Sequence, residues 1–167
     1  MSTCDEKDLS NVAVSFVTAG GGVVGTTDYL VQAQGSPNNT VLVNTGKAYV
    51  PTADGTMVYA TRMDATQNVT IAANSSGNPR VDSVVLYCDL SASPDPAADN
   101  VAKFFAVQGT PGGSPVAPTN AQILAAIGAG NPYIVLATIN VANGFTSINS
   151  GNITDARAFA RISGGDS

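Results

Sequence analysis

Four charged residues have types and spacings that would allow them to act together. Arg80 and Asp82 stand two residues apart at the start of an apolar run, and Asp155 and Arg157 stand two apart near the end of the chain. Residues two apart in an extended strand project from the same face. If the two segments lie side by side, the four side chains form one paired cluster that fixes strand register or locks a subunit contact. The alternative is four unrelated surface charges.

The residues that support most enzyme chemistry are missing or isolated. The chain has no histidine, which removes the usual general base, the usual metal ligand and every Ser-His or Cys-His arrangement. Cys4 and Cys88 are distant in sequence, so they do not suggest a zinc site. The glycines at 20–22 lack the Gly-Lys-Ser/Thr of a phosphate loop and precede a predicted strand. We therefore expect no enzymatic activity, no cofactor and no metal.

Carboxylates are the remaining side chains that support metal binding or glycoside hydrolysis. Asp95, Asp99 and Asn100 share one loop, but their spacing does not match an EF-hand, and we expect them to be solvated. Most other aspartates occupy turn contexts, where local hydrogen bonding explains them. Glycosidases use paired carboxylates and usually present aromatic platforms, whereas this chain has no tryptophan and only 6% aromatic residues. The composition therefore disfavours a glycosidase.

The elements that must position these residues are nearly all short strands. Apolar residues alternate with polar ones between turn-forming glycine, proline, asparagine and aspartate residues. One short helix is predicted near 120–127, with Thr119 as its N-cap and Gly128 after its end. The predicted strands are 12–17, 29–34, 40–44, 47–50, 57–61, 68–72, 80–90, 103–108, 133–141, 145–148 and 153–159.

The run at 80–90 is predicted to be a central strand. Val84, Leu86 and Cys88 share one face with Arg80 and Asp82, and the opposite face is also largely apolar. Cys88 therefore reads as a small buried hydrophobe. We expect a single all-β domain over 12–162, an antiparallel β-sandwich or small barrel with one short helix, between a flexible arm at 1–11 and a flexible tail at 163–167.

The composition points to protein partners. Charged residues make up 11% of the 167 residues, well below the roughly 25% of globular proteins, and surfaces with little charge repel one another weakly. The net charge of −5 and seven scattered basic residues argue against nucleic acid, and no run of about 20 apolar residues predicts a membrane span. The acidic start of the sequence does not resemble a signal peptide, so we expect synthesis and retention in a cytoplasm.

The order of several short phrases resembles a β-rich module of tailed-bacteriophage virion proteins. The chain reads PRVD at 79–82 before its most apolar strand, VQGTP at 107–111 before a proline loop, and ITDAR at 153–157. The phrases GKAYV at 46–50 and NVTIA at 68–72 precede them in the order typical of that module. Such modules occur in baseplate, tail-fibre and receptor-binding proteins, often at the virion-attached end.

The resemblance implies a non-enzymatic virion protein, made in a bacterial host and assembled by protein–protein contacts. A tail, baseplate or fibre-anchor position is favoured, and a capsid decoration protein that stabilises the shell is the main alternative. The resemblance also implies a homotrimer that binds other virion proteins. A further alternative is a module that binds carbohydrate on a host surface, although the five tyrosines stand mostly at predicted strand positions.

Overall fold

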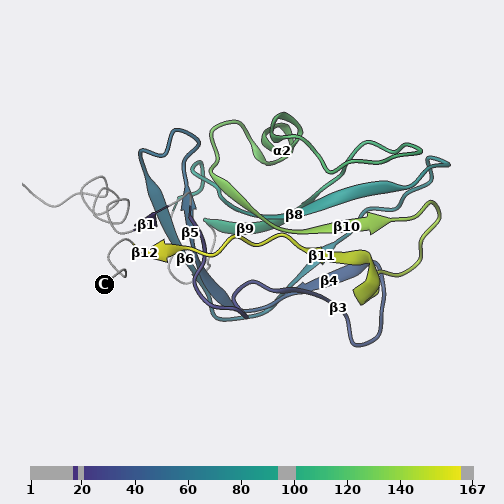
Figure 1. The fold of residues 1–167 in the computed structure, drawn as a ribbon, viewed down its shortest axis with the longest axis horizontal. Coiled ribbons are helices and arrows are strands. Elements are labelled where there is room, and N and C mark those ends of the chain that lie inside the picture. Colours follow the sequence, from purple (N-terminus) through teal and green to yellow (C-terminus); the bar gives the residue numbers. More distant parts are fainter. Residues whose placement is uncertain (1–16, 19–20, 94–100, 163–167) are drawn as a thin grey trace, which may run out of the picture.

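A computed structural model describes residues 17–18, 21–93 and 101–162. These residues form mainly antiparallel strands with one α-helix, which confirms the all-β prediction. The arrangement is a sandwich of sheets (Figure 1). The expected arm at 1–11, the tail at 163–167 and most of the strand expected at 12–17 lie outside the described residues.

The largest sheet has the strand order β11-β10-β8-β9. Its two long central strands are β8 (Arg80–Cys88) and β10 (Tyr133–Val141), flanked by β9 (Ala102–Val107) and β11 (Ile153–Asp155). Nearly every residue of β8 is buried, which confirms that it is central and apolar on both faces. The strand ends at Cys88, two residues before the predicted limit, and Leu90 is exposed.

A three-stranded sheet, β3-β4-β7, packs against one face of the large sheet. It consists of β3 (Val31–Ala33), β4 (Thr40–Val43) and β7 (Gln67–Thr70). Strand β7 lies beside β9 and β11 lies beside β3, so the two layers approach each other along both edges. The core between the layers contains, among others, Val31, Val41, Val43, Val69, Ile71, Val84, Leu86, Leu136, Ile139 and Val141.

Two further groups of strands lie at one end of the sandwich, on the left in Figure 1. One is the sheet β2-β5-β6, formed by β2 (Gly22–Val23), β5 (Gly46–Pro51) and β6 (Val58–Met63). The other is the pair of β1 (Val17–Thr18) and β12 (Arg161–Ile162). Val23, Ala48, Val50 and Met63 extend the core into this end.

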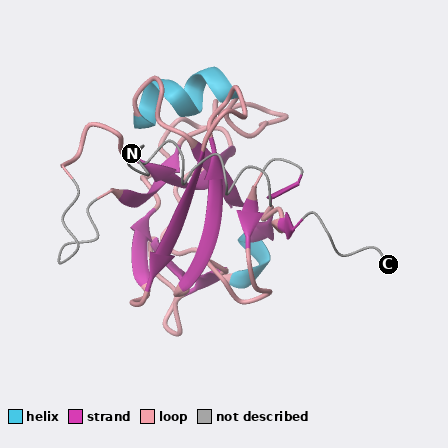
Figure 2. Cartoon of the chain, turned by 90° about the vertical axis from the view of Figure 1, so that its left-hand side faces the viewer, coloured by secondary structure: helices cyan, strands magenta, loops and turns pink. Residues whose placement is uncertain are grey.

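Helix α2 (Asn120–Ile127) covers the outer face of the large sheet (Figure 2). Ile123 and Ile127 pack against Val85 and Val107, which point away from the main core. The Thr119 hydroxyl accepts from the Gln122 N–H, and the Gln122 side chain accepts from the Thr119 N–H, which completes a capping box. The predicted helix bounds and both caps are confirmed.

The segment after β10 departs from the prediction. Residues 145–148 form no strand, although Ile148 is fully buried, and the 3-10 helix η1 (Ser150–Asn152) leads into β11. The apolar residues that suggested a strand at 145–148 belong to a loop from which Ile148 packs into the core. The Ile148 N–H donates to the Asn38 carbonyl. The predicted strand at 153–159 is regular only as far as Asp155, and Phe159 forms an isolated bridge with Val23.

Candidate functional site

The Arg80–Asp82 pair joins three segments inside the sandwich. Arg80 Nε donates to Asp82 Oδ1 at 2.7 Å and Nη2 donates to Oδ2 at 2.9 Å, with side-chain exposures of 4% and 0%. The guanidinium also donates to the carbonyls of Ala72, at 2.6 Å, and Ala73, at 3.3 Å. The pair therefore ties the segment after β7 to the start of β8 and satisfies buried groups that would otherwise be costly.

Asp82 also fixes the loop after β9. Its Oδ1 accepts from the Gly109 N–H at 3.1 Å, and the Pro79 carbonyl accepts from the Gly112 N–H at 3.0 Å. Glycine is required at 109 because a Cβ there would lie 2.0 Å from the Val81 carbonyl oxygen. Residues of the PRVD and VQGTP phrases are thus in direct contact, and both phrases serve the fold.

The Asp155–Arg157 pair repeats this geometry at another place. Arg157 Nε donates to Asp155 Oδ1 at 2.9 Å and Nη2 donates to Oδ2 at 2.7 Å. Arg157 Nη1 donates to the carbonyls of Thr26, at 3.0 Å, and Asp28, at 2.7 Å. The next residue, Tyr29, is fully buried with a φ of 51°, a backbone conformation that is uncommon for a bulky residue. Arg157 therefore stabilises a conformationally restricted loop.

The structure brings the members of each pair together but does not bring the two pairs together. Strand β10 lies between β8 and β11, so the predicted segments are not neighbours. Asp82 is opposite Ile139 of β10, and Asp155 is opposite Ala137 of the same strand. The cluster of four expected from the spacing is replaced by two separate ion pairs. The alternative of four unrelated surface charges is also wrong, because the side chains of Arg80, Asp82 and Arg157 are at most 4% exposed.

Three other ionisable groups have pKa values far from 7. Lys103 donates to Asp89 at 2.7 Å, and with Ser91 it lowers the pKa of Asp89 to about 2. Burial raises the pKa of the Cys88 thiol to about 11 and that of Tyr29 to about 12. At neutral pH this carboxylate is ionised while the thiol and phenol are protonated. None of these three groups is suited to transfer protons near pH 7.

The described residues hold neither a candidate metal cluster nor a candidate membrane-spanning helix. In the part of the chain that the structure describes, no three Asp, Glu, Cys or His side chains gather closely enough to hold a metal ion. Asp95, Asp99 and Asn100, the loop considered for calcium, lie outside the described residues, as does Cys4. No helix in the described ranges is both long enough and apolar enough to span a bilayer.

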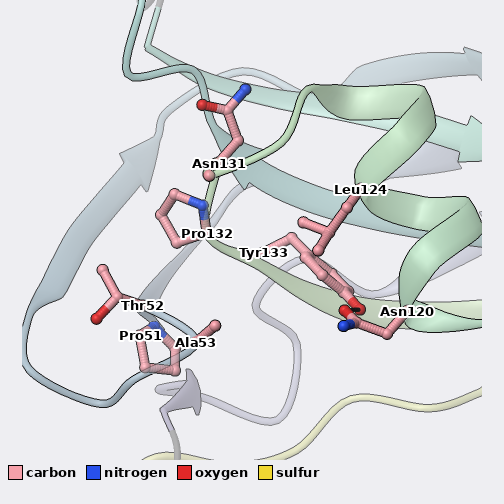
Figure 3. A pocket seen from close by; sticks show the side chains of 9 residues that line it. Pro51, Thr52, Ala53, Asn120, Leu124, Asn131, Pro132 and Tyr133 are labelled. Carbon is pink, nitrogen blue, oxygen red and sulfur yellow. Dashed lines mark hydrogen bonds between the residues drawn. The ribbon is translucent and has the colours of Figure 1, made fainter.

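Two hollows on the surface were not foreseen from the sequence. One, of about 400 Å³, lies between the turn after β5, helix α2 and the segment that leads into β10 (Figure 3). The other, of about 310 Å³, lies between β7 and β9, beside the exposed ring of Phe105. Each is lined by residues from segments far apart in sequence. The second hollow is lined by four residues of the NVTIA phrase and by Gln108 of VQGTP, and the alternation in 103–108 places Phe104 and Phe105 on opposite faces beside it.

No protein-family model, no curated protein and no solved structure matches the chain. The resemblance to phage virion modules therefore rests on the chain's own phrases. The contacts described above give those phrases a structural role, because PRVD, VQGTP and ITDAR each supply a residue to one of the two ion-pair networks. The network residues Arg80, Asp82, Gly109, Asp155 and Arg157 line neither of the two hollows described above.

Proposed function

We propose that the chain is a non-enzymatic structural protein of a tailed-bacteriophage virion, a tail, baseplate or fibre-anchor component held by protein–protein contacts. The order of the sequence phrases and the low charged content support this assignment. The ion pairs of those phrases are directed to backbone groups, which is the arrangement expected of a rigid structural module and not of a reactive site.

The observation that carries the proposal is the groove at the edge of the large sheet, whose lining residues are all uncharged. Strand β9 is an edge strand, and β7 lies beside it without joining the same sheet. Phe104 packs inward, with its ring 5.4 Å from that of Tyr29, whereas the neighbouring Phe105 is 45% exposed. The groove between the strands is lined by Asn68, Val69, Thr70, Ala72, Phe104, Phe105, Ala106 and Gln108.

The groove carries none of the charges that usually protect an exposed strand edge from association. The one charged residue of β9, Lys103, is engaged by Asp89. Aromatic residues are enriched and charged residues depleted at the centre of protein interfaces. The groove with Phe105 is therefore suited to bury apolar surface against a neighbouring protein, at roughly 25 cal/mol per Å².

The test is binding of the purified protein to particles assembled without it. The proposal expects stoichiometric addition to tails or tail tips, by a species that light scattering identifies as an oligomer, with a trimer expected from the resemblance. Phe105→Ser should weaken addition about tenfold, the effect of losing about 1.4 kcal/mol. Val24→Ser is the matched control, because Val24 is 51% exposed and does not line the groove.

The location of binding separates the alternatives. Addition only to heads would identify a capsid decoration protein and overturn the tail assignment. A monomer that adds to neither heads nor tails would overturn the assembly role itself. Equal losses for Phe105→Ser and Val24→Ser would remove the groove as the contact surface.

A further inference from the structure

The hollow beside α2 has mainly apolar walls. Pro51 and Ala53 form one side, Leu124 of α2 forms the opposite side, and Pro132 and Tyr133 lie between them (Figure 3). The Tyr133 hydroxyl donates to Asn120 Oδ1 at 2.7 Å, which holds the phenol against the start of the helix. No charged residue lines the hollow.

The polar groups of the hollow are mostly engaged within the protein. The Asn131 amide accepts from the Leu90 N–H and donates to the Ile127 carbonyl. The Thr52 hydroxyl donates to Asp54 Oδ1 and accepts from the Met57 N–H. Asn120 lines the hollow and uses its oxygen for Tyr133, which leaves its Nδ2 as the donor of this side chain. The hollow therefore offers apolar contact and a side-chain donor.

This combination favours a ligand that is apolar and uncharged and that has an acceptor for the Asn120 donor. A proline-containing extended segment meets these requirements, because proline has no N–H and its neighbouring carbonyls accept hydrogen bonds. Grooves lined by aromatic and proline side chains commonly bind such segments. A sugar fits less well, because its several hydroxyls would be buried with too few partners, each at a cost of about 1–3 kcal/mol.

The chain itself presents such a segment. Val116 is 67% exposed and follows Pro115, in a stretch from 109 to 122 that contains no charged residue. The Thr110–Val116 bridge and the hydrogen bond from Gly112 to Pro79 hold the loop in place, so little entropy is lost when it docks. Neither Pro115 nor Val116 lines the hollow of its own chain.

We propose that the hollow of one copy receives Pro115 and Val116 of a second copy, with Asn120 Nδ2 donating to a carbonyl of that segment. Where the two copies exchange segments across a two-fold axis the contact closes a dimer, and where the contact is not reciprocal it grows head-to-tail into a ring or a filament. The inference rests on the proposed assembly role. It uses a surface distinct from the β7–β9 groove, so each proposal can fail alone.

The experiment combines one variant of each surface in sedimentation equilibrium over a concentration series. Asn120→Asp removes the donor and places a carboxylate at the start of a helix, where negative charge is tolerated. Val116→Asp changes an exposed side chain of the loop. Wild-type protein should self-associate, and each variant should raise the dissociation constant at least tenfold. Val24→Asp, at another exposed valine, should associate as wild type does.

An equimolar mixture of the two variants gives the decisive result. The Val116→Asp copy retains an intact hollow and the Asn120→Asp copy retains an intact segment, so the mixture should form a heterodimer that grows no further. Wild-type protein that stays monomeric, variants that associate normally, or a mixture without heterodimer would each overturn the inference. Loss of self-association in Phe105→Ser alone would assign it to the β7–β9 groove instead.

A peptide titration tests the chemistry of the occupant. The peptide Gly-Ser-Pro-Val-Ala, from residues 113–117, should shift the backbone amide resonances of Asn120 and Leu124 in the Val116→Asp protein. Replacement of its proline by alanine should weaken binding about tenfold. Shifts with glucose or galactose but none with the peptide would replace the peptide by a sugar and overturn the inference.

Discussion

The two arginine–aspartate pairs have the same local design and different surroundings. In both, residues two apart form a two-point ion pair, and the arginine also donates to two backbone carbonyls of another segment. That segment is 7–8 residues away in sequence for Arg80 and 129–131 residues away for Arg157. The two arginines are equally buried, with 4% of each side chain exposed. The aspartates differ, since Asp82 is fully buried and Asp155 is 49% exposed.

This difference in aspartate exposure indicates that the arginine and the carboxylate contribute to stability in different ways. Arg80 connects the start of β8 to the segment that follows β7, and Arg157 connects the segment after β11 to residues 26–28. Loss of either arginine therefore leaves two backbone carbonyls without their donors. The carboxylate orients the guanidinium, and its importance depends on whether water can replace it. Water reaches Asp155, whereas Asp82 is enclosed and also binds the Gly109 N–H. Equal geometry therefore does not imply equal energy.

The largest effect is expected for Asp82→Ala. This change leaves the Arg80 guanidinium buried without its counter-charge and the Gly109 N–H without its acceptor. Removal of one partner of a buried ion pair costs about 3–5 kcal/mol. We expect the free energy of unfolding, measured by urea denaturation, to fall by that amount.

The double variant Arg80→Met/Asp82→Leu sharpens this prediction. Replacement of a whole buried pair by apolar side chains is often much less harmful than removal of one partner. The double variant should therefore be more stable than Asp82→Ala. If it were less stable, the hydrogen bonds to Ala72, Ala73 and Gly109 would dominate over the uncompensated charge.

An intermediate effect is expected for Arg157→Met. The change removes the donors to the carbonyls of Thr26 and Asp28, beside the left-handed Tyr29. Hydrogen bonds to charged groups contribute about 1.5–3 kcal/mol, and we expect a loss of about 2 kcal/mol in urea denaturation. Hydrogen exchange should rise first in residues 25–30.

Arg62→Met provides the matched control for Arg157. Arg62 forms the same two-residue pair with Asp64, but both side chains are more than 60% exposed. Its replacement should leave the unfolding curve unchanged. Equal effects at the two arginines would mean that the carbonyl contacts of Arg157 do not matter.

The local rules predicted the parts of the fold that depend on neighbours in sequence. The alternation at 80–90 and 133–141 predicted β8 and β10, and Thr119 and Gly128 predicted the ends of α2. Spacing by two also predicted that each charged pair shares one face. Strand order was not predictable, because it depends on which long-range pairings bury most surface, and the insertion of β10 therefore separated the two pairs. The hollows were not predictable for the same reason, since Pro51 and Tyr133 are far apart in sequence and come together only in the folded chain.

Apart from the Arg62→Met control, the smallest effect is expected for Asp155→Asn, and its pH dependence identifies the carboxylate as its source. The hydrogen bond from Arg157 lowers the pKa of Asp155 below its usual range. A carboxyl group whose pKa is lower in the folded state stabilises that state above the unfolded value of about 3.9, and the contribution disappears as the pH falls through the folded pKa. Because Asp155 is half exposed, solvent screening limits the effect to about 0.5 kcal/mol at pH 7.

Urea denaturation of wild type and Asp155→Asn at a series of pH values measures this contribution. The difference in unfolding free energy should be constant above about pH 5 and should shrink below about pH 4, as Asp155 becomes neutral in both states. Salt at about 1 M should reduce the difference at pH 7, because the carboxylate is open to screening. A difference that persists unchanged at low pH would show that Asp155 acts through its hydrogen bond to the Arg157 N–H and not through its charge. The two aspartates would then differ in kind and not only in their exposure to water.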